Sequence, residues 1–227
     1  MPAADGAVLV CLETGGRLSF ASALDWPGWS RSGRGDDAAL EALRTYAPRY
    51  APVARAAGQK PPDVGNIEII ERLPGSATTD FGVLEAIAEL ERAPLISAEL
   101  ERLIRLLEAC WELFDGVVAG APATLRKGPR GGGRDREAIV DHVLGAEAEM
   151  YARKLGLRLP RPALDDLTAR AAARAAIADA LRADEGSALH PVGAKGWPPR
   201  YAIRRIAWHV LDHAWEIEDK SGPTPGT

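Results

Sequence analysis

Apolar and polar positions divide the chain into two unlike parts. Up to about residue 75 the pattern is that of short strands with one helix among them. The run 7–13 (AVLVCLE) is apolar, and 17–24 (RLSFASAL) alternates between apolar and polar residues. Gly15-Gly16 lies between these runs, which predicts a hairpin of two antiparallel strands.

The rest of this first part is one turn-rich passage, one helix and one strand. Residues 25–35 (DWPGWSRSGRG) are rich in turn formers, and a helix is expected over about 37–56. Pro48 and Pro52 lie inside that helix and favour an earlier end. The segment 66–73 (NIEIIERL) has the pattern of another strand.

Beyond residue 80 the apolar positions recur at helical spacing. In the longest helix they alternate steps of four and three, as in the buried seam of a bundle helix: Ile96, Leu100, Leu103, Leu107, Cys110, Phe114 and Val117. The other predicted helices cover 81–92, 136–155, 163–184 and 199–220. The expected fold class is therefore α+β and mainly α: an α+β domain over 1–79, a four-helix bundle over 80–221 and a disordered tail over 222–227.

Charge and hydropathy argue against two classes of partner. The net charge is −4, whereas nucleic-acid-binding domains are normally basic. No run approaches the ~18 apolar residues of a membrane span, and the N-terminus lacks the basic region of a signal peptide. Cys11 and Cys110 lie far apart in apolar surroundings, which predicts buried, reduced thiols and a cytoplasmic protein.

Three of the four histidines are placed so that they can meet. His209 and His213 are four residues apart, so they are separated by about 40° around the last helix, beside its Ile/Val stripe. His142 holds the same position beside the apolar stripe of the 136–155 helix, which includes Met150. Either these side chains are polar packing neighbours, or two helices bring three imidazoles to one metal ion. Three imidazoles with an open fourth position are typical of a catalytic Zn²⁺ site.

Two glutamates and a fourth histidine are further candidates. Glu149 and Glu216 fall near −20° on their helices, on the histidine side. Each is either a group that supports a ligand, a fourth ligand, a general base, or simply an exposed carboxylate. His190 lies in a predicted loop.

Two segments resemble helices of a known superfamily. The segment PPRYAIRRIAWHVLDHAWEIED resembles the last helix of the DinB-like metalloproteins, and DREAIVDHVLGAEAEMY resembles their second helix. That family is a four-helix bundle whose metal is held by one histidine and an HxxxH pair, which correspond here to His142, His209 and His213. Some members are thiol-dependent transferases, isomerases or hydrolases, so the resemblance implies a low-molecular-weight thiol as co-substrate.

The first part has a resemblance of its own. The segment RLSFASALDWPGWSRSGRGDDAALEAL is similar to the HicB-like fold, in which a strand leads through a D-x-P-G turn into a helix. HicB-like modules bind partners and are not themselves catalytic. The chain has no evident DNA-binding appendix.

Two functions remain open at this stage. The first is a metal-dependent enzyme that performs thiol transfer or hydrolysis on a small molecule; an open metal face beside a pocket favours it. The second is a non-catalytic, metal-stabilised bundle with a protein-binding module; a fourth protein ligand that closes the site favours it. Zn²⁺ or Ni²⁺ is the expected ion, although imidazoles also suit Cu²⁺ and Fe²⁺.

A second apolar stripe on the last helix predicts a further contact. Tyr201, Trp208 and Trp215 recur every seven residues on the side opposite the Ile/Val face. Exposed, such rings form an apolar patch of the kind that marks an interface. We expect the stripe to be covered by the N-terminal domain or by a second copy of the chain in a homodimer.

Overall fold

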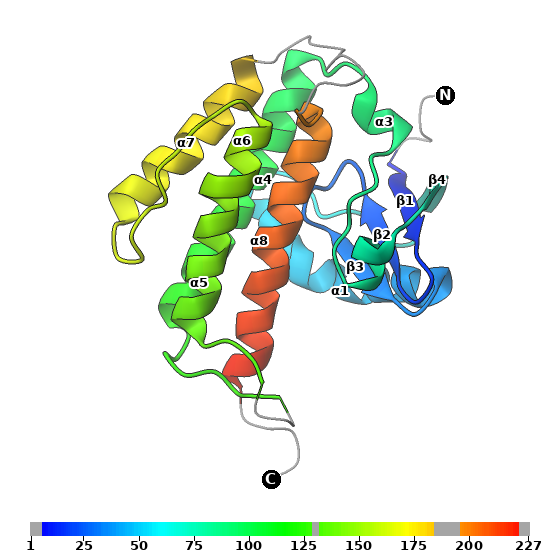
Figure 1. Ribbon diagram of the computed structural model, residues 1–227. Coiled ribbons are helices and arrows are strands. Elements are labelled where there is room, and N and C mark those ends of the chain that lie inside the picture. The colour runs from blue at the N-terminus through cyan, green and yellow to red at the C-terminus, as the bar shows by residue number, and fades with distance from the viewer. Residues whose placement is uncertain (1–5, 129–131, 184–195, 223–227) are drawn as a thin grey trace.

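The computed structural model describes residues 6–128, 132–183 and 196–222. Its four-stranded sheet has the order β3-β2-β1-β4. Strands β1 (Val8–Thr14) and β2 (Ser19–Ala23) form the predicted antiparallel hairpin, and β4 (Ile67–Pro74) pairs with β1 in parallel. The sheet and the helix over residues 36–56 lie on one side of the molecule, and the other long helices lie on the other side (Figure 1). The fold class is α+β, as expected.

The turn-rich passage contains a strand that the pattern did not predict. Residues Ser30–Gly33 form β3, which pairs with β2 in antiparallel orientation. The turn before it packs against the helices, because Gly28 has a φ of 92° and a Cβ there would lie 2.6 Å from Leu211 Cδ1. The position of β3 is therefore determined by the tertiary contacts of the turn before it, and not by a strand-like pattern in its own sequence.

Helix α1 (Asp36–Ala56) runs unbroken past both prolines, so the expected early end is wrong. The reason is packing of the turns that follow them. Tyr50 is fully buried and donates a hydrogen bond from its hydroxyl to the carbonyl of Pro27, at 2.9 Å. Val53 is buried as well. These contacts hold the C-terminal part of α1 in place despite the missing backbone donors.

The predicted helix over 81–92 is also wrong in its first two thirds. Only α2 (Ala77–Asp80) and α3 (Glu89–Arg92) are helical here. The backbone N–H groups of Glu85 and Ala86 each donate to the buried carboxylate of Glu13 on β1, at 3.0 Å. Because this carboxylate satisfies the backbone donors, the segment does not need a helix to do so.

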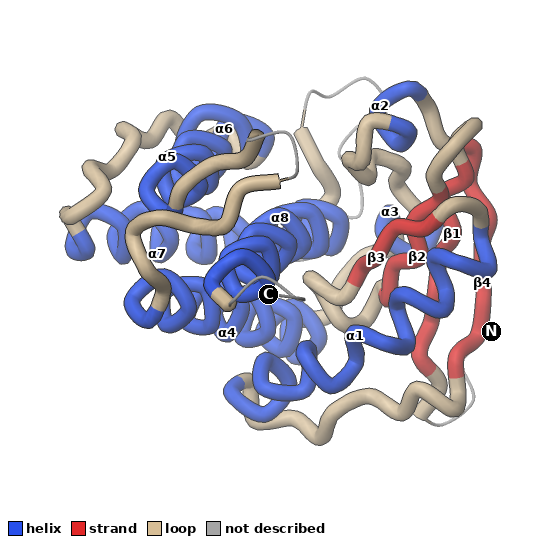
Figure 2. The backbone as a smooth tube through the Cα atoms, turned by 90° about the horizontal axis from the view of Figure 1, so that it is seen from below, coloured by secondary structure: helices blue, strands red, loops and turns tan. Residues whose placement is uncertain are grey.

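The remaining helices lie where the periodicity predicts them: α4 (Ser97–Gly120), α5 (Arg136–Gly145), the π-helical turn η1 (Ala146–Tyr151), α6 (Ala152–Lys154), α7 (Leu167–Ala183) and α8 (Pro199–Ser221). Helix α8 is central, with α4 along it, α5 and η1 on one side and α3 on the other (Figure 2). The four-helix-bundle topology and the boundary at residue 79 stay predictions. The last five residues of the predicted tail lie outside the described residues.

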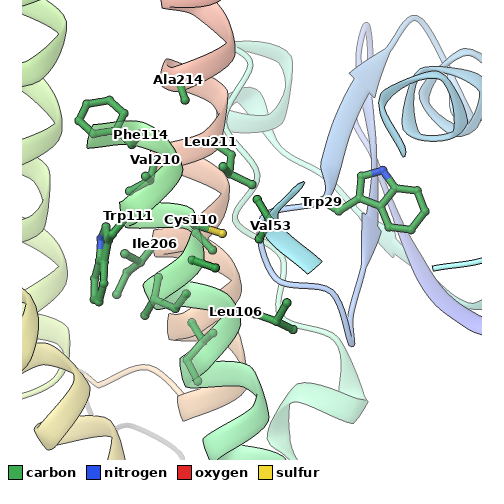
Figure 3. Packing of buried hydrophobic residues seen from close by; sticks show 14 of the residues in the cluster. Trp29, Val53, Leu106, Cys110, Trp111, Phe114, Ile206, Val210, Leu211 and Ala214 are labelled. Carbon is green, nitrogen blue, oxygen red and sulfur yellow. The ribbon is translucent and has the colours of Figure 1, made fainter. Parts of the chain in front are cut away.

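One continuous core joins the two parts of the chain. Leu106, Cys110 and Phe114 of α4, Val210 and Leu211 of α8, and Trp29 and Val53 of the N-terminal part all belong to one cluster (Figure 3). Both cysteines are buried and free, as predicted. Burial raises the pKa of Cys11 to about 12 and that of Cys110 still further, so neither thiol ionises near neutral pH.

The aromatic stripe of α8 is covered by the chain itself. The Trp208 ring meets Phe20 of β2 edge-on, with 5.7 Å between ring centroids, and the Trp215 ring meets Tyr46 of α1 at 5.1 Å. The Tyr201 hydroxyl donates to the Glu85 carbonyl at 3.1 Å. The N-terminal part therefore covers Trp208 and Trp215, and the segment that follows it contacts Tyr201, so this stripe does not provide the surface for the predicted homodimer.

None of the helices in the described ranges has both the length and the apolar composition needed to cross a membrane.

Candidate metal centre

Three histidines, one from α5 and two from α8, lie close together. His142 of α5 and His209 and His213 of α8 each offer a ring nitrogen, and these nitrogens lie within 4.8 Å of one another. The Nε2 atoms of His142 and His209 are 3.1 Å apart. The helical wheel of each segment predicted this meeting, because both α5 and α8 carry their histidines on the edge of an apolar stripe. Ile139 and Val143 of α5 and Ile206 and Val210 of α8 are all buried.

The carboxylate of Glu216 supports His213. Its Oε2 lies 2.7 Å from His213 Nδ1, and its Oε1 accepts from Lys220 at 2.5 Å. The hydrogen bond with His213, together with Lys220, lowers the pKa of Glu216 to about 2. A charged carboxylate at Nδ1 keeps the proton on that nitrogen, so Nε2 of His213 retains its lone pair for a metal. Glu216 is thus a supporting group for a ligand, one of the roles expected for it.

Glu149 has no such role. It is exposed, and its carboxylate pairs with Arg161 at 3.7 Å. The cause is η1: a π-helical turn adds a residue and rotates everything after it by about 100° relative to α5. The same rotation exposes Met150, which was expected in the core, and buries Tyr151 against the ring of His209, with 5.4 Å between centroids.

Two of the three imidazoles are held in their neutral form. Burial, followed by the neighbouring His213 and Arg134, lowers the pKa of His142 to about 4. Burial, followed by the charges of His213 and Arg205, places the pKa of His209 well below its ordinary value. Both rings therefore carry free lone pairs at neutral pH, which is the form that binds a metal.

The donor set fits a small divalent ion. In a tetrahedral Zn²⁺ site with Zn–N bonds near 2.0–2.1 Å, ligand nitrogens lie about 3.3 Å apart. The separation between His142 and His209 is 3.1 Å, and the other separations are no larger than 4.8 Å, a difference that small side-chain rotations absorb. Among the described residues no fourth protein ligand completes the group. The Nδ1 of His209 is buried without a hydrogen bond, so no carboxylate orients this ring in the way that Glu216 orients His213.

The histidines form one wall of a cavity of about 420 Å³. Its other lining residues are Phe81, Gly82, Val83, Arg134, Ala146, Met150, Tyr151, Arg205, Trp208 and Asp212. Larger cavities of about 550 and 580 Å³ lie around residues 153–159 and between α4 and α7, away from the histidines. We take the smaller one as the site because only it combines candidate ligands with access from solvent.

Several lining residues could not be chosen from the sequence. Phe81 and Val83 come from the segment that was expected to be helical, and the apolar pattern assigned no position to Tyr151. Nothing in the sequence indicated a role for Arg205 except its position four residues before His209. His190 lies outside the described residues.

No family model, curated protein or solved structure matches this chain. The resemblances to DinB-like and HicB-like proteins therefore rest on the quoted segments alone and stay predictions.

Proposed function

We propose that the chain is a metal-dependent enzyme that acts on a small molecule. The observation that supports this proposal is the opening of the three-histidine group onto a cavity of about 420 Å³, with no fourth protein ligand among the described residues. A closed four-ligand group is the usual form of a structural site, whereas three ligands and an accessible position are typical of a catalytic one.

The ion would be Zn²⁺ or Ni²⁺, held by His142, His209 and His213. When bound, it supplies Lewis acidity that lowers the pKa of a water molecule or a thiol. The protein's own contribution is to keep His142 and His209 neutral, to fix His213 through Glu216, and to limit water around the site with Tyr151 and Trp208. Hydrolysis or thiol transfer is the chemistry that this arrangement serves.

The choice between water and a thiol rests on the resemblance to DinB-like proteins, some of which use low-molecular-weight thiols. We propose that this chain belongs to that superfamily and that a thiol is its co-substrate. The segment that follows the predicted N-terminal domain contributes to the same site, because Phe81, Gly82 and Val83 line the cavity. The N-terminal domain, whether or not it is related to HicB-like modules, supports the site indirectly, because Phe20 packs against Trp208 of the lining.

Elemental analysis of protein purified without a histidine tag tests the metal. After incubation with Zn²⁺ or Ni²⁺ and removal of excess ion, the wild type should retain stoichiometric metal. His142→Ala and His209→Ala should lose it, and Glu149→Ala, a nearby carboxylate outside the group, should not. Equal retention by the wild type and both histidine variants would exclude the three-histidine site.

A second measurement separates an enzyme from a metal-stabilised scaffold. The metal-loaded protein is assayed on panels of esters, amides and thiol acceptors, and its melting temperature is measured before and after removal of the ion with EDTA. We expect turnover that His142→Ala abolishes. Bound metal with no turnover, together with a melting temperature that falls when the metal is removed, would support the non-catalytic alternative.

A further inference from the structure

Arg205 lies in line with two of the metal-ligand candidates. Arg205, His209 and His213 follow one another at intervals of four residues on α8, so they share one face of the helix. All three line the same cavity. One helical turn, a rise of about 6 Å over four residues, separates Arg205 from His209 along the helix axis.

The guanidinium of Arg205 is buried without a carboxylate partner. Its side chain is 8% exposed, and no acidic group of the described chain forms an ion pair with it. Its hydrogen bond goes to the Tyr151 hydroxyl, at 3.1 Å. The rings of Tyr151 and Trp208 flank it, with their centroids 5.3 Å and 4.7 Å from the guanidinium carbon.

The other buried arginines of the described residues provide a comparison within the same molecule. Each of them pairs with at least one carboxylate: Arg170 and Arg174 with Asp115, Arg200 with Asp25 and Glu99, and Arg204 with Glu91. Burying a charge is costly unless a counter-ion and hydrogen bonds compensate it. Arg205 is the exception among these residues, and it is the one that lines the cavity beside the histidines.

We propose that Arg205 binds a carboxylate of the substrate, so that the enzyme acts on small organic acids. A guanidinium presents two parallel N–H groups that match the two oxygens of a carboxylate, and the flanking rings hold its plane. The proposal rests on the proposed function, since it names the substrate class of that site. The carboxylate occupies the Arg205 end of the cavity, and the group that reacts lies about one helical turn away, at the histidines.

The rim of the cavity indicates the rest of the ligand. Phe81 is 85% exposed and Met150 is 60% exposed, and both line this cavity. Apolar side chains at the mouth of a pocket with one cation inside suit an acid that carries an apolar or aromatic substituent. Arg134, the other cation of the lining, is already paired with Glu216 at 3.6 Å, so the cavity offers one free guanidinium and thus a site for a single carboxylate.

Binding of simple probes to the metal-free protein tests this proposal independently of the metal. Phenylacetate and its neutral analogue phenylacetamide are titrated by calorimetry into wild-type protein dialysed against EDTA. A charge-assisted hydrogen-bond pair should make the acid bind roughly tenfold or more tightly than the amide. Arg205→Gln should abolish that preference. Arg205→Lys, which keeps the charge without the fork, should retain part of it. Arg105→Gln, on the exposed face of α4, is the matched control and should leave it unchanged.

Three results would overturn the assignment: equal affinity of the wild type for acid and amide, a preference that survives in Arg205→Gln, or tighter binding of phenyl phosphate than of phenylacetate. Circular dichroism of each variant confirms that it is folded, and Arg205→Lys preserves the test if Arg205→Gln does not fold. If the metal experiments fail while the preference for the acid persists, the proposed enzyme function is wrong and the carboxylate site stands. If the metal experiments succeed while the preference for the acid is absent, the metal centre is supported and the proposed substrate class is wrong.

Discussion

Two adjacent arginines on α8 are surrounded by very different polar groups. Arg204 faces the sheet side, where its guanidinium pairs with buried Glu91 at 2.5 Å and also donates to the Ala86 carbonyl at 2.9 Å. Arg205 faces the histidine cavity, where it has one phenolic partner and no carboxylate among the described residues. The two residues are similar in burial, yet one is compensated by the protein and the other is not.

The difference separates a structural region from a binding region. On the sheet side the buried charges of Arg204 and Glu91 meet each other within the chain, so this pair is compensated without a ligand. On the cavity side the guanidinium of Arg205 and the neutral imidazoles of His142 and His209 have no carboxylate partner among the described residues. A protein that keeps uncompensated groups in a pocket loses stability there, and binding of a ligand recovers it.

The largest loss of stability is expected when the sheet-side pair is broken. Arg204→Met leaves the Glu91 carboxylate fully buried beside an apolar side chain. Removing one partner of a buried ion pair costs roughly 3–5 kcal/mol, and we expect the upper end because the hydrogen bond to the Ala86 carbonyl is lost as well. Urea unfolding measures the change. Glu89→Ala, an exposed glutamate of α3, is the control and should change the free energy of unfolding by less than about 0.5 kcal/mol.

A somewhat smaller loss is expected at the stripe that the N-terminal part covers. Trp215→Ala removes a ring that packs on Tyr46 and lies near the guanidinium groups of Arg31 and Arg49, 5.4 and 5.6 Å from its centroid. We expect a loss of roughly 3 kcal/mol, the lower end for such truncations, because these neighbours lie near the surface and can close part of the cavity.

Light scattering on the same variant tests whether the aromatic stripe packs within one chain or between two copies of it. The mass of Trp215→Ala should equal that of the parent, because the ring packs within one chain. A melting temperature within a degree or two of the parent's would mean that the packing of this ring does not stabilise the fold. A mass of the variant below that of the parent would mean that the parent is a homodimer held together by this stripe.

The sheet side and the cavity side also differ in how far the sequence predicts them. The helical wheel placed His142, His209 and His213 correctly, because α5 up to Gly145 and the whole of α8 are regular helices with clear apolar stripes. It misplaced Met150, because nothing in the local sequence indicates that a π-helical turn shifts the phase after Gly145. Regular elements follow from periodicity, whereas a single inserted residue depends on the packing around it.

Long-range contacts account for the other differences. The segment 81–88 has a helical pattern, but Glu13, far away in the sequence, binds its backbone donors. Pro48 and Pro52 are tolerated because Tyr50 reaches Pro27. Arg205 was missed for a similar reason: its importance lies in the absence of a counter-ion, and the pairing of charges is settled only by the fold.

A moderate effect is expected from pH on the cavity side. Because the folded-state pKa of His142 is about 4, below the value of 6.5 for a free histidine, the unfolded chain binds more protons than the folded one between these values. His209 shifts in the same direction. The free energy of unfolding of the metal-free protein should therefore fall from pH 7.5 to pH 5, by about 1–2 kcal/mol once the solvent exposure of His142 is allowed for.

Urea unfolding at a series of pH values measures this dependence, and His142→Gln should flatten it. In the metal-loaded protein, protons compete with the ion over the same range, so metal should be released as the pH falls. A pH dependence as steep in His142→Gln as in the parent would show that other groups cause it.

The smallest effect is expected from the arginine that has no counter-ion. Arg205→Met removes a buried charge that the protein does not compensate, and replaces it with a flexible apolar side chain that can lie between the same two rings. The loss of the hydrogen bond to Tyr151 and of the contact with Trp208 is offset by the lower cost of burying methionine. We expect the free energy of unfolding to change by no more than about 1 kcal/mol, against the 3–5 kcal/mol expected for Arg204→Met one residue earlier. Urea unfolding of the two variants side by side gives the answer. Equal losses would mean that both arginines stabilise the fold in the same way, and the division of α8 into a structural side and a binding side would no longer hold.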